Sequence, residues 1–117
     1  MKCALPALLF LIATPVVADA PVIEAAQATR TGDSWRFDVT LSHPDSGWDH
    51  YADAWRVLAP DGTELGIRVL AHPHEQEQPF TRSLGNVHIP PGLAEVKIEA
   101  RCLTDGWSGD LITLSLP

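Results

Sequence analysis

The sequence predicts an all-β domain, built as a sandwich of seven short strands. Apolar and polar residues alternate along short segments, and no apolar pattern at helical spacing persists for long enough to indicate a helix in the mature chain. Turn sequences with glycine, proline or aspartate separate these segments about every ten residues. The clearest strand is segment 34–42, whose odd-numbered residues from Trp35 to Leu41 are all apolar. Such a strand buries one face and leaves the other in solvent.

The other strands follow in order along the chain. The seven expected strands are segments 21–29, 34–42, 49–58, 63–70, 80–89, 94–102 and 111–116. Gly85 is expected to kink the fifth strand. Tight turns are expected at Thr31-Gly32-Asp33, Pro60-Asp61-Gly62 and Pro90-Pro91-Gly92. In number, length and turn spacing these strands resemble the immunoglobulin and fibronectin type III sandwiches. Within that resemblance, Trp55 corresponds to the buried tryptophan of the third strand, and Cys102 to the second bridging cysteine.

The first twenty residues read as a secretory signal peptide. Lys2 supplies the positive start, residues 4–17 form the apolar run, and Ala18-Asp19-Ala20 gives the cleavage pattern. The mature domain is then 21–117, periplasmic or secreted. Cys3 precedes the apolar run, and this position does not indicate lipid anchoring. Cleavage of the signal peptide would remove Cys3 and leave Cys102 without an intrachain disulfide partner. Cys102 lies on the core face of its strand, which favours an inert buried thiol over a metal ligand or an intermolecular disulfide.

The net charge of −7 at pH 7 limits the classes of partner that the protein can bind. Nucleic acid is not expected, and neither is an anionic membrane surface or stable membrane insertion after signal cleavage. A cationic partner, a metal ion or simple solubility fits this sign. The sequence contains no nucleophile elbow, phosphate loop or supported Cys-His pair, so we expect a monomeric binding domain and not an enzyme.

A register argument brings histidines together. A three-residue turn closing Ala59 on Thr63, with Gly62 in the left-handed conformation, sets odd positions opposite odd positions. Trp55 then faces Ile67, with Leu65, Ile67 and Val69 turned toward the core. Extended further, this register places His50 opposite His72, and His74 projects to the same side.

The loops after the second, fourth and sixth strands are expected at one pole of the sandwich, and they hold most of the histidines. One interpretation is a copper or zinc site formed by His50, His72 and His74. Further candidate ligands at this pole are His43, Asp49, Glu75 and Glu77. The alternative is that these are solvated loop histidines with local hydrogen bonds.

The same loops carry Trp48 and Trp107, which are candidates for binding a partner together with Asp49 and Arg82. Exposed aromatic side chains are favoured at recognition surfaces. The alternative function is therefore a metal-free module that binds an envelope protein or a glycan. Both tryptophans could instead fold back and cap the core, and Arg82 could simply pair with the acidic loop.

Two motifs carry a family resemblance. The run from Gly47 to Asp53 (GWDHYAD), with His72-Pro73-His74-Glu75 and the run from Glu77 to Arg82 (EQPFTR), resembles a group of small exported bacterial proteins with no assigned activity. The resemblance implies a bacterial envelope setting, most simply the periplasm. It implies no ligand, reaction or catalytic residue.

Overall fold

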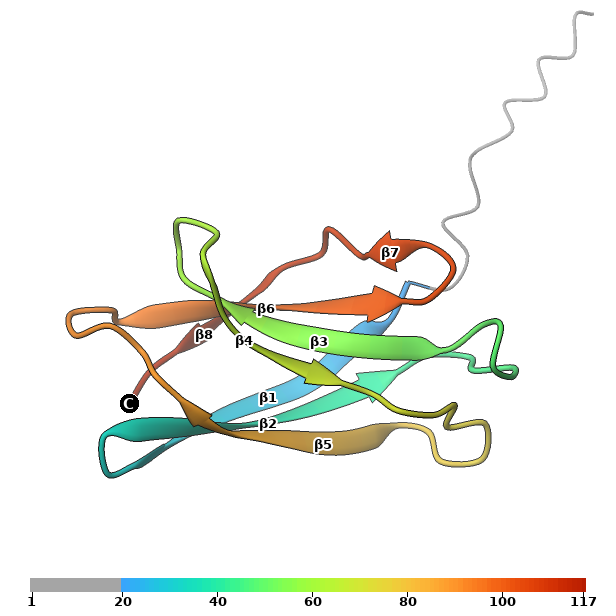
Figure 1. The fold of residues 1–117 in the computed structure, drawn as a ribbon, viewed down its shortest axis with the longest axis horizontal. Helices are drawn as coiled ribbons and strands as arrows, with labels where there is room; N and C mark the ends of the chain where they lie inside the picture. Colours follow the sequence, from blue (N-terminus) through green and yellow to red (C-terminus); the bar gives the residue numbers. More distant parts are fainter. Residues whose placement is uncertain (1–19) are drawn as a thin grey trace, which may run out of the picture.

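The computed structural model describes residues 20–117 as two antiparallel sheets packed face to face (Figure 1). The expected signal peptide and Cys3 lie outside the described residues, apart from Ala20. The strands, in chain order, are β1 (Val22–Thr31), β2 (Ser34–Ser42), β3 (Ala52–Leu58), β4 (Glu64–Val69), β5 (Phe80–Val87), β6 (Glu95–Cys102), β7 (Gly106–Trp107) and β8 (Ile112–Ser115). No helix in this part of the chain has the length and apolar character needed to cross a membrane.

The predicted sandwich is confirmed, with one change at its last strand. The smaller sheet has the order β1-β2-β5, and the larger has β4-β3-β6 with both β7 and β8 paired to β6. The edge partner of β6 is therefore in two pieces, since β7 pairs with Arg101 and Cys102 while β8 pairs with residues 95–98. The two-residue β7 lies inside the segment that was expected to be a loop.

The core lies between the inner faces of the two sheets. Trp55 is fully buried, as its place in the third strand predicted, and Phe37 and Val39 from β2 are buried in the same hydrophobic core. Cys102 is also fully buried and is in no disulfide. In β5 the pairing register shifts beside Gly85, where Asn86 adopts a φ of 56°, so the expected kink is a β-bulge.

The register predicted for β3 and β4 is wrong beyond the turn. The turn itself is as expected, with the Ala59 amide donating to the Thr63 carbonyl at 2.8 Å and Gly62 at a φ of 92°. A bulge at Leu65 then shifts the pairing by one residue, so that Trp55 faces Arg68 and not Ile67. Ile67 and Val69 consequently point outward and are 40% and 60% exposed.

Three loops gather at one pole of the sandwich, at the right of Figure 1. They are the loop between β2 and β3, the loop between β4 and β5, and the connection from β6 to β7. The tight turns β1–β2, β3–β4 and β5–β6 lie at the opposite pole, as the strand count predicted. All the residues considered below for metal binding belong to the first pole.

Candidate metal centre

A short turn before β3 places His50. The His50 amide donates to the Gly47 carbonyl at 3.1 Å, and the Ser46 amide donates to the His50 carbonyl at 3.0 Å. Gly47 has a φ of 149°, a conformation that residues with a Cβ rarely adopt. The turn folds the chain back on itself, so that the ring of His50 lies 4.9 Å from the ring of His43, measured between centroids.

The end of β6 is tied to the same turn. The Leu103 amide donates to the Tyr51 carbonyl at 3.0 Å, and the Thr104 hydroxyl donates to the Asp49 carbonyl at the same distance. Cys102 is the register partner of Ala52 in the neighbouring strand β3. These bonds bring the last core-facing residue of β6 beside the histidines that precede β3.

A buried carboxylate holds the pole together. Asp45 Oδ1 accepts hydrogen bonds from His43 Nδ1 at 2.5 Å and from the Ala52 amide at 2.9 Å. Asp45 Oδ2 accepts from the His74 amide at 2.7 Å. Its side chain has no exposed surface. Three donors satisfy both oxygens, which is what a buried charge requires.

Asp45 also fixes the ring of His43. Because an ionised carboxylate only accepts hydrogen bonds, Nδ1 carries the hydrogen and the lone pair of the neutral ring is on Nε2. His43 is 3% exposed, and its Nε2 is buried without a hydrogen-bond partner. A histidine whose second nitrogen donates to a carboxylate is the usual arrangement around a protein-bound metal.

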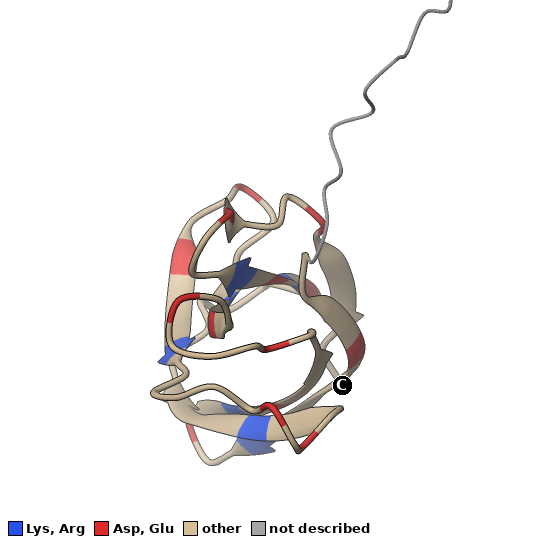
Figure 2. Cartoon of the chain, turned by 90° about the vertical axis from the view of Figure 1, so that its right-hand side faces the viewer, with Lys and Arg blue, Asp and Glu red and all other residues tan. Residues whose placement is uncertain are grey.

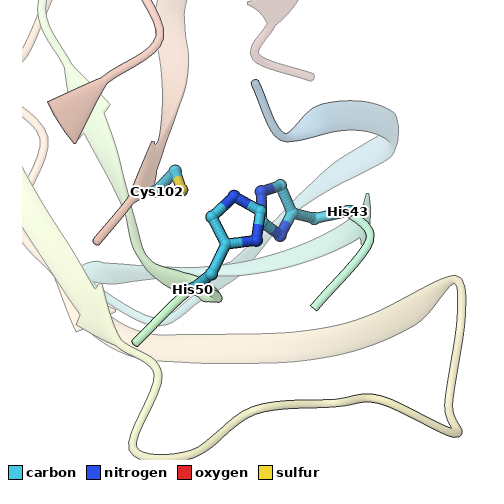
Figure 3. A group of neighbouring side chains, drawn as sticks. All are labelled: His43, His50 and Cys102. Carbon is cyan, nitrogen blue, oxygen red and sulfur yellow. The ribbon is translucent and has the colours of Figure 1, made fainter. Parts of the chain in front are cut away.

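His43, His50 and Cys102 form the only group of three or more metal-type ligands found in residues 20–117 (Figure 3). One ligand atom from each lies within 4.8 Å of the other two. Figure 3 shows the three side chains converging from the loop, the turn and the end of β6. His43 and Cys102 are buried, whereas His50 is half-buried and forms the more accessible side of the group.

The loop between β4 and β5 forms a separate histidine pair. The rings of His72 and His74 are 4.5 Å apart, and His74 stacks on Phe80 at 3.9 Å with an interplanar angle of 9°. His72 is exposed and its Nδ1 lies 3.0 Å from the Pro73 carbonyl. The structure thus groups His50 with His43 and leaves His72 and His74 outside the ligand group, with Glu75 exposed beside them.

His74 is buried without hydrogen bonds to its ring nitrogens. Its Nδ1 lies 3.8 Å from Asp45 Oδ2. Desolvation lowers the pKa of His74 below its usual value, and the positive charges of Arg82 and His72 act in the same direction. We therefore expect this ring to be neutral at pH 7, packed as a flat apolar surface against Phe80.

The acidic residues of this pole are mostly on the surface. Figure 2 looks directly at the pole and shows acidic segments on the loops that face the viewer. Asp49, Glu75, Glu77 and Asp105 are exposed there. Arg82 donates to Glu77 at 2.9 Å, the pairing with the acidic loop that the sequence suggested. A surface of this sign attracts cations toward the pole.

The two candidate partner-binding tryptophans differ in their surroundings. Trp48 is 68% exposed and, among the aromatic rings of residues 20–117, contacts the edge of Tyr51 at 6.0 Å between centroids. Trp107 is half-buried, and the guanidinium of Arg56 lies 3.8 Å above its ring. The same guanidinium donates to the buried carboxylate of Glu99 at 2.6 Å. Trp107 is thus packed into the outer face of the larger sheet.

Sequence reasoning missed two residues of this centre. Cys102 was interpreted as an inert core thiol because its alternation matches that of the core residues. Asp45 was given no role because the sequence shows no cleft in which a carboxylate pair such as Asp45 and Asp49 could act. His43 and Asp45 are two positions apart in the sequence, which is compatible with the hydrogen bond between them, but only the fold shows that both are buried.

One curated protein is similar to this chain over most of its length. It is named "Putative lipoprotein" and comes from Halomicrobium mukohataei, an archaeon; it is 35% identical over 96 residues, which cover 82% of this chain. The chain spans about half of that relative's length, 47%. No family model matches the sequence, and no solved structure matches it. The similarity extends beyond the bacterial group that the motifs resemble.

Proposed function

We propose that this protein is an exported β-sandwich that binds one transition-metal ion, copper or zinc, through His43, His50 and Cys102. The observation that carries the proposal is the buried and unpartnered Nε2 of His43, directed toward a second imidazole and a thiol. A buried polar atom without a partner is costly unless something binds it. Two imidazoles and one thiolate form a donor set that suits copper and zinc.

The three ligand atoms need to move only slightly closer together to bind an ion. Bonds of about 2.0–2.1 Å to nitrogen and about 2.3 Å to sulfur place ligand atoms roughly 3.3–3.8 Å apart. The three ligand atoms here lie within 4.8 Å of one another. His50 is half-buried and its Nδ1 lies 3.5 Å from the Ser46 hydroxyl, whereas the Asp45 hydrogen bond holds the buried His43 in place.

Export rests on two independent observations. The N-terminal segment has the order of charge, apolar run and small residues that a signal peptide requires. The similar protein from Halomicrobium mukohataei is named "Putative lipoprotein", and lipoproteins are exported proteins. An exported metal-binding domain would serve in storage, delivery or sensing of the ion outside the cytoplasm.

The test is a calorimetric titration of the purified protein with Zn(II), and with Cu(I) under anaerobic conditions. We expect one-to-one binding that His50→Ala and Cys102→Ala each weaken by more than the 10–100-fold typical of changes outside the ligand shell. His72→Ala is the matched control, because His72 is an exposed histidine of the same pole outside the ligand group. Binding lost in His72→Ala and retained in His50→Ala would refute the site.

The exposure of Trp48 supports a second function at the same pole. A tryptophan that is 68% exposed, beside Tyr51, is a platform for a peptide or a sugar ring. Under this proposal the protein binds an envelope protein or a glycan without metal. Trp48→Ala would then abolish partner capture and leave the fold intact, whereas His50→Ala would leave capture unchanged. Trp107 is a weaker candidate because Arg56 covers its ring.

A further inference from the structure

We infer that the centre is selective for Cu(I), held in a three-coordinate site by His43 Nε2, an imidazole nitrogen of His50 and the thiolate of Cys102. This inference rests on the proposed metal function and specifies its ligand. It is carried by the number of available donors, by their softness and by the fixed orientation of His43.

The number of donors is the first argument. Within residues 20–117 the ligand group has three members, and a fourth protein ligand is missing from it. Asp45, the acidic residue bonded to His43, is outside the ligand group, and its two oxygens already accept three hydrogen bonds within the pole. Structural zinc sites are almost always four-coordinate, so zinc would need water in its fourth position. Cu(I) forms stable three-coordinate complexes and has no such need.

The chemistry of the donors is the second argument. A thiolate is a soft ligand, and soft ligands select Cu(I) over the harder divalent ions. Cys102 is fully buried and is the only cysteine in the part of the chain that the structure describes. Within this part it therefore has no second thiol with which to form an intrachain disulfide, so its sulfur remains available to the ion.

The orientation of His43 is the third argument. The bond between Asp45 and Nδ1 directs the lone pair of Nε2 into the group before any ion arrives. The backbone amides of Ala52, at the start of β3, and of His74, in the loop between β4 and β5, hold Asp45 itself. Two of the three donors thus lie on fixed and buried supports, which favours an ion that accepts the angles the protein offers. Cu(I), with a filled d shell, imposes few angular demands of its own.

The experiment is an anaerobic competition on the full chain. Bicinchoninate competes for Cu(I), and equimolar Zn(II) is then added to the copper-loaded protein. X-ray absorption at the copper edge counts the nitrogen and sulfur neighbours. We expect one Cu(I) per chain, two nitrogens and one sulfur around it, and no displacement by Zn(II). Cys3→Ala is the control for the second cysteine of the full chain and should bind as the wild type does.

The failures of the two proposals are distinguishable. If Zn(II) displaces Cu(I), or if the ion has four protein or water neighbours, the Cu(I) inference is overturned while the metal site stands. If neither ion binds, or if Cys102→Ala and His50→Ala bind both ions like the wild type, the metal function itself fails. Circular dichroism of each variant separates loss of binding from loss of the fold.

Discussion

The carboxylate of Asp45 and the imidazole of His43 form a fully buried hydrogen bond of 2.5 Å at one pole of the sandwich. The same carboxylate accepts hydrogen bonds from the backbone amide of His74, in another loop, and from that of Ala52, at the start of β3. One side chain therefore orders two loops and the first residue of a strand. It also sets which nitrogen of His43 faces the ligand group.

Asp45→Asn should weaken both the fold and the metal site. Asparagine replaces one of the two accepting oxygens with an NH2 group, which donates hydrogen bonds. At least one of the three hydrogen bonds that Asp45 accepts is therefore lost. The expected loss of unfolding free energy is about 2–3 kcal/mol, measured by urea denaturation. Metal affinity should fall about 10–100-fold. Asp49→Asn, on an exposed carboxylate four residues along the chain, is the control. Equal stability and affinity in the two variants would contradict the assigned role of Asp45.

The unfolding free energy of the metal-free protein should depend on His74 below pH 6.5. Burial lowers the pKa of His74 in the folded state, so the unfolded chain takes up a proton first as the pH falls. The stability that the neutral ring provides is present above the unfolded pKa of 6.5. It is lost progressively as the pH falls below 6.5 toward the lowered folded pKa.

The measurement is the urea midpoint of the wild type and of His74→Gln from pH 8 to pH 5. Subtracting the two curves isolates the contribution of His74, together with its interactions with the charges of Arg82, His72, Asp45 and Glu77 that act on this ring. The wild type should lose more stability than the variant on acidification. A difference of zero, or one of opposite sign, would show that His74 is not held neutral by the fold.

The strand pattern could be predicted because alternation depends on each residue and its neighbours in the chain. The Leu65 bulge could not, because it depends on how β4 packs against β5 in the other sheet, where Leu84 and Val87 lie against Gly66. One extra residue in β4 reversed which side chains face the core, and with it the pairing from which His50 was placed opposite His72.

The pole of the candidate site and two of its three members could be predicted from the sequence. His43 was named because it lies in a loop of this pole, whereas His50 was named from a hairpin register that the structure shows to be shifted by one residue. Cys102 was not chosen because it occupies a core-facing position in the alternating pattern of β6. In the sequence, a ligand at such a position looks the same as a residue that only packs in the core. Asp45 could be recognised only once its partners, the amides of Ala52 and His74, were known.

The observed register makes Ile67 an exposed position. Ile67→Thr should change the unfolding free energy by no more than about 0.5 kcal/mol, because the side chain points to solvent. Val57→Ala, in the paired strand and fully buried, should cost about 2 kcal/mol or more. Chemical denaturation compares the two. In the register expected from the turn alone, Ile67 would face the core and Ile67→Thr would be as costly as Val57→Ala.

The same shift makes Gly66 a core-facing position without room for a side chain. A Cβ on Gly66 would lie 3.0 Å from Leu84 Cδ2 and 3.3 Å from Val87 Cγ2, so in Gly66→Ala these two methyl groups must give way by a few tenths of an ångström. The expected cost is about 1–3 kcal/mol of unfolding free energy. Gly85→Ala is the matched control, because a Cβ there meets no atom within 4 Å. We expect the unfolding free energy of the control to differ from that of the wild type by no more than about 0.5 kcal/mol. A Gly66→Ala variant as stable as Gly85→Ala would mean that β4 does not pack its even-numbered residues onto β5, and the bulge at Leu65 would then be in error.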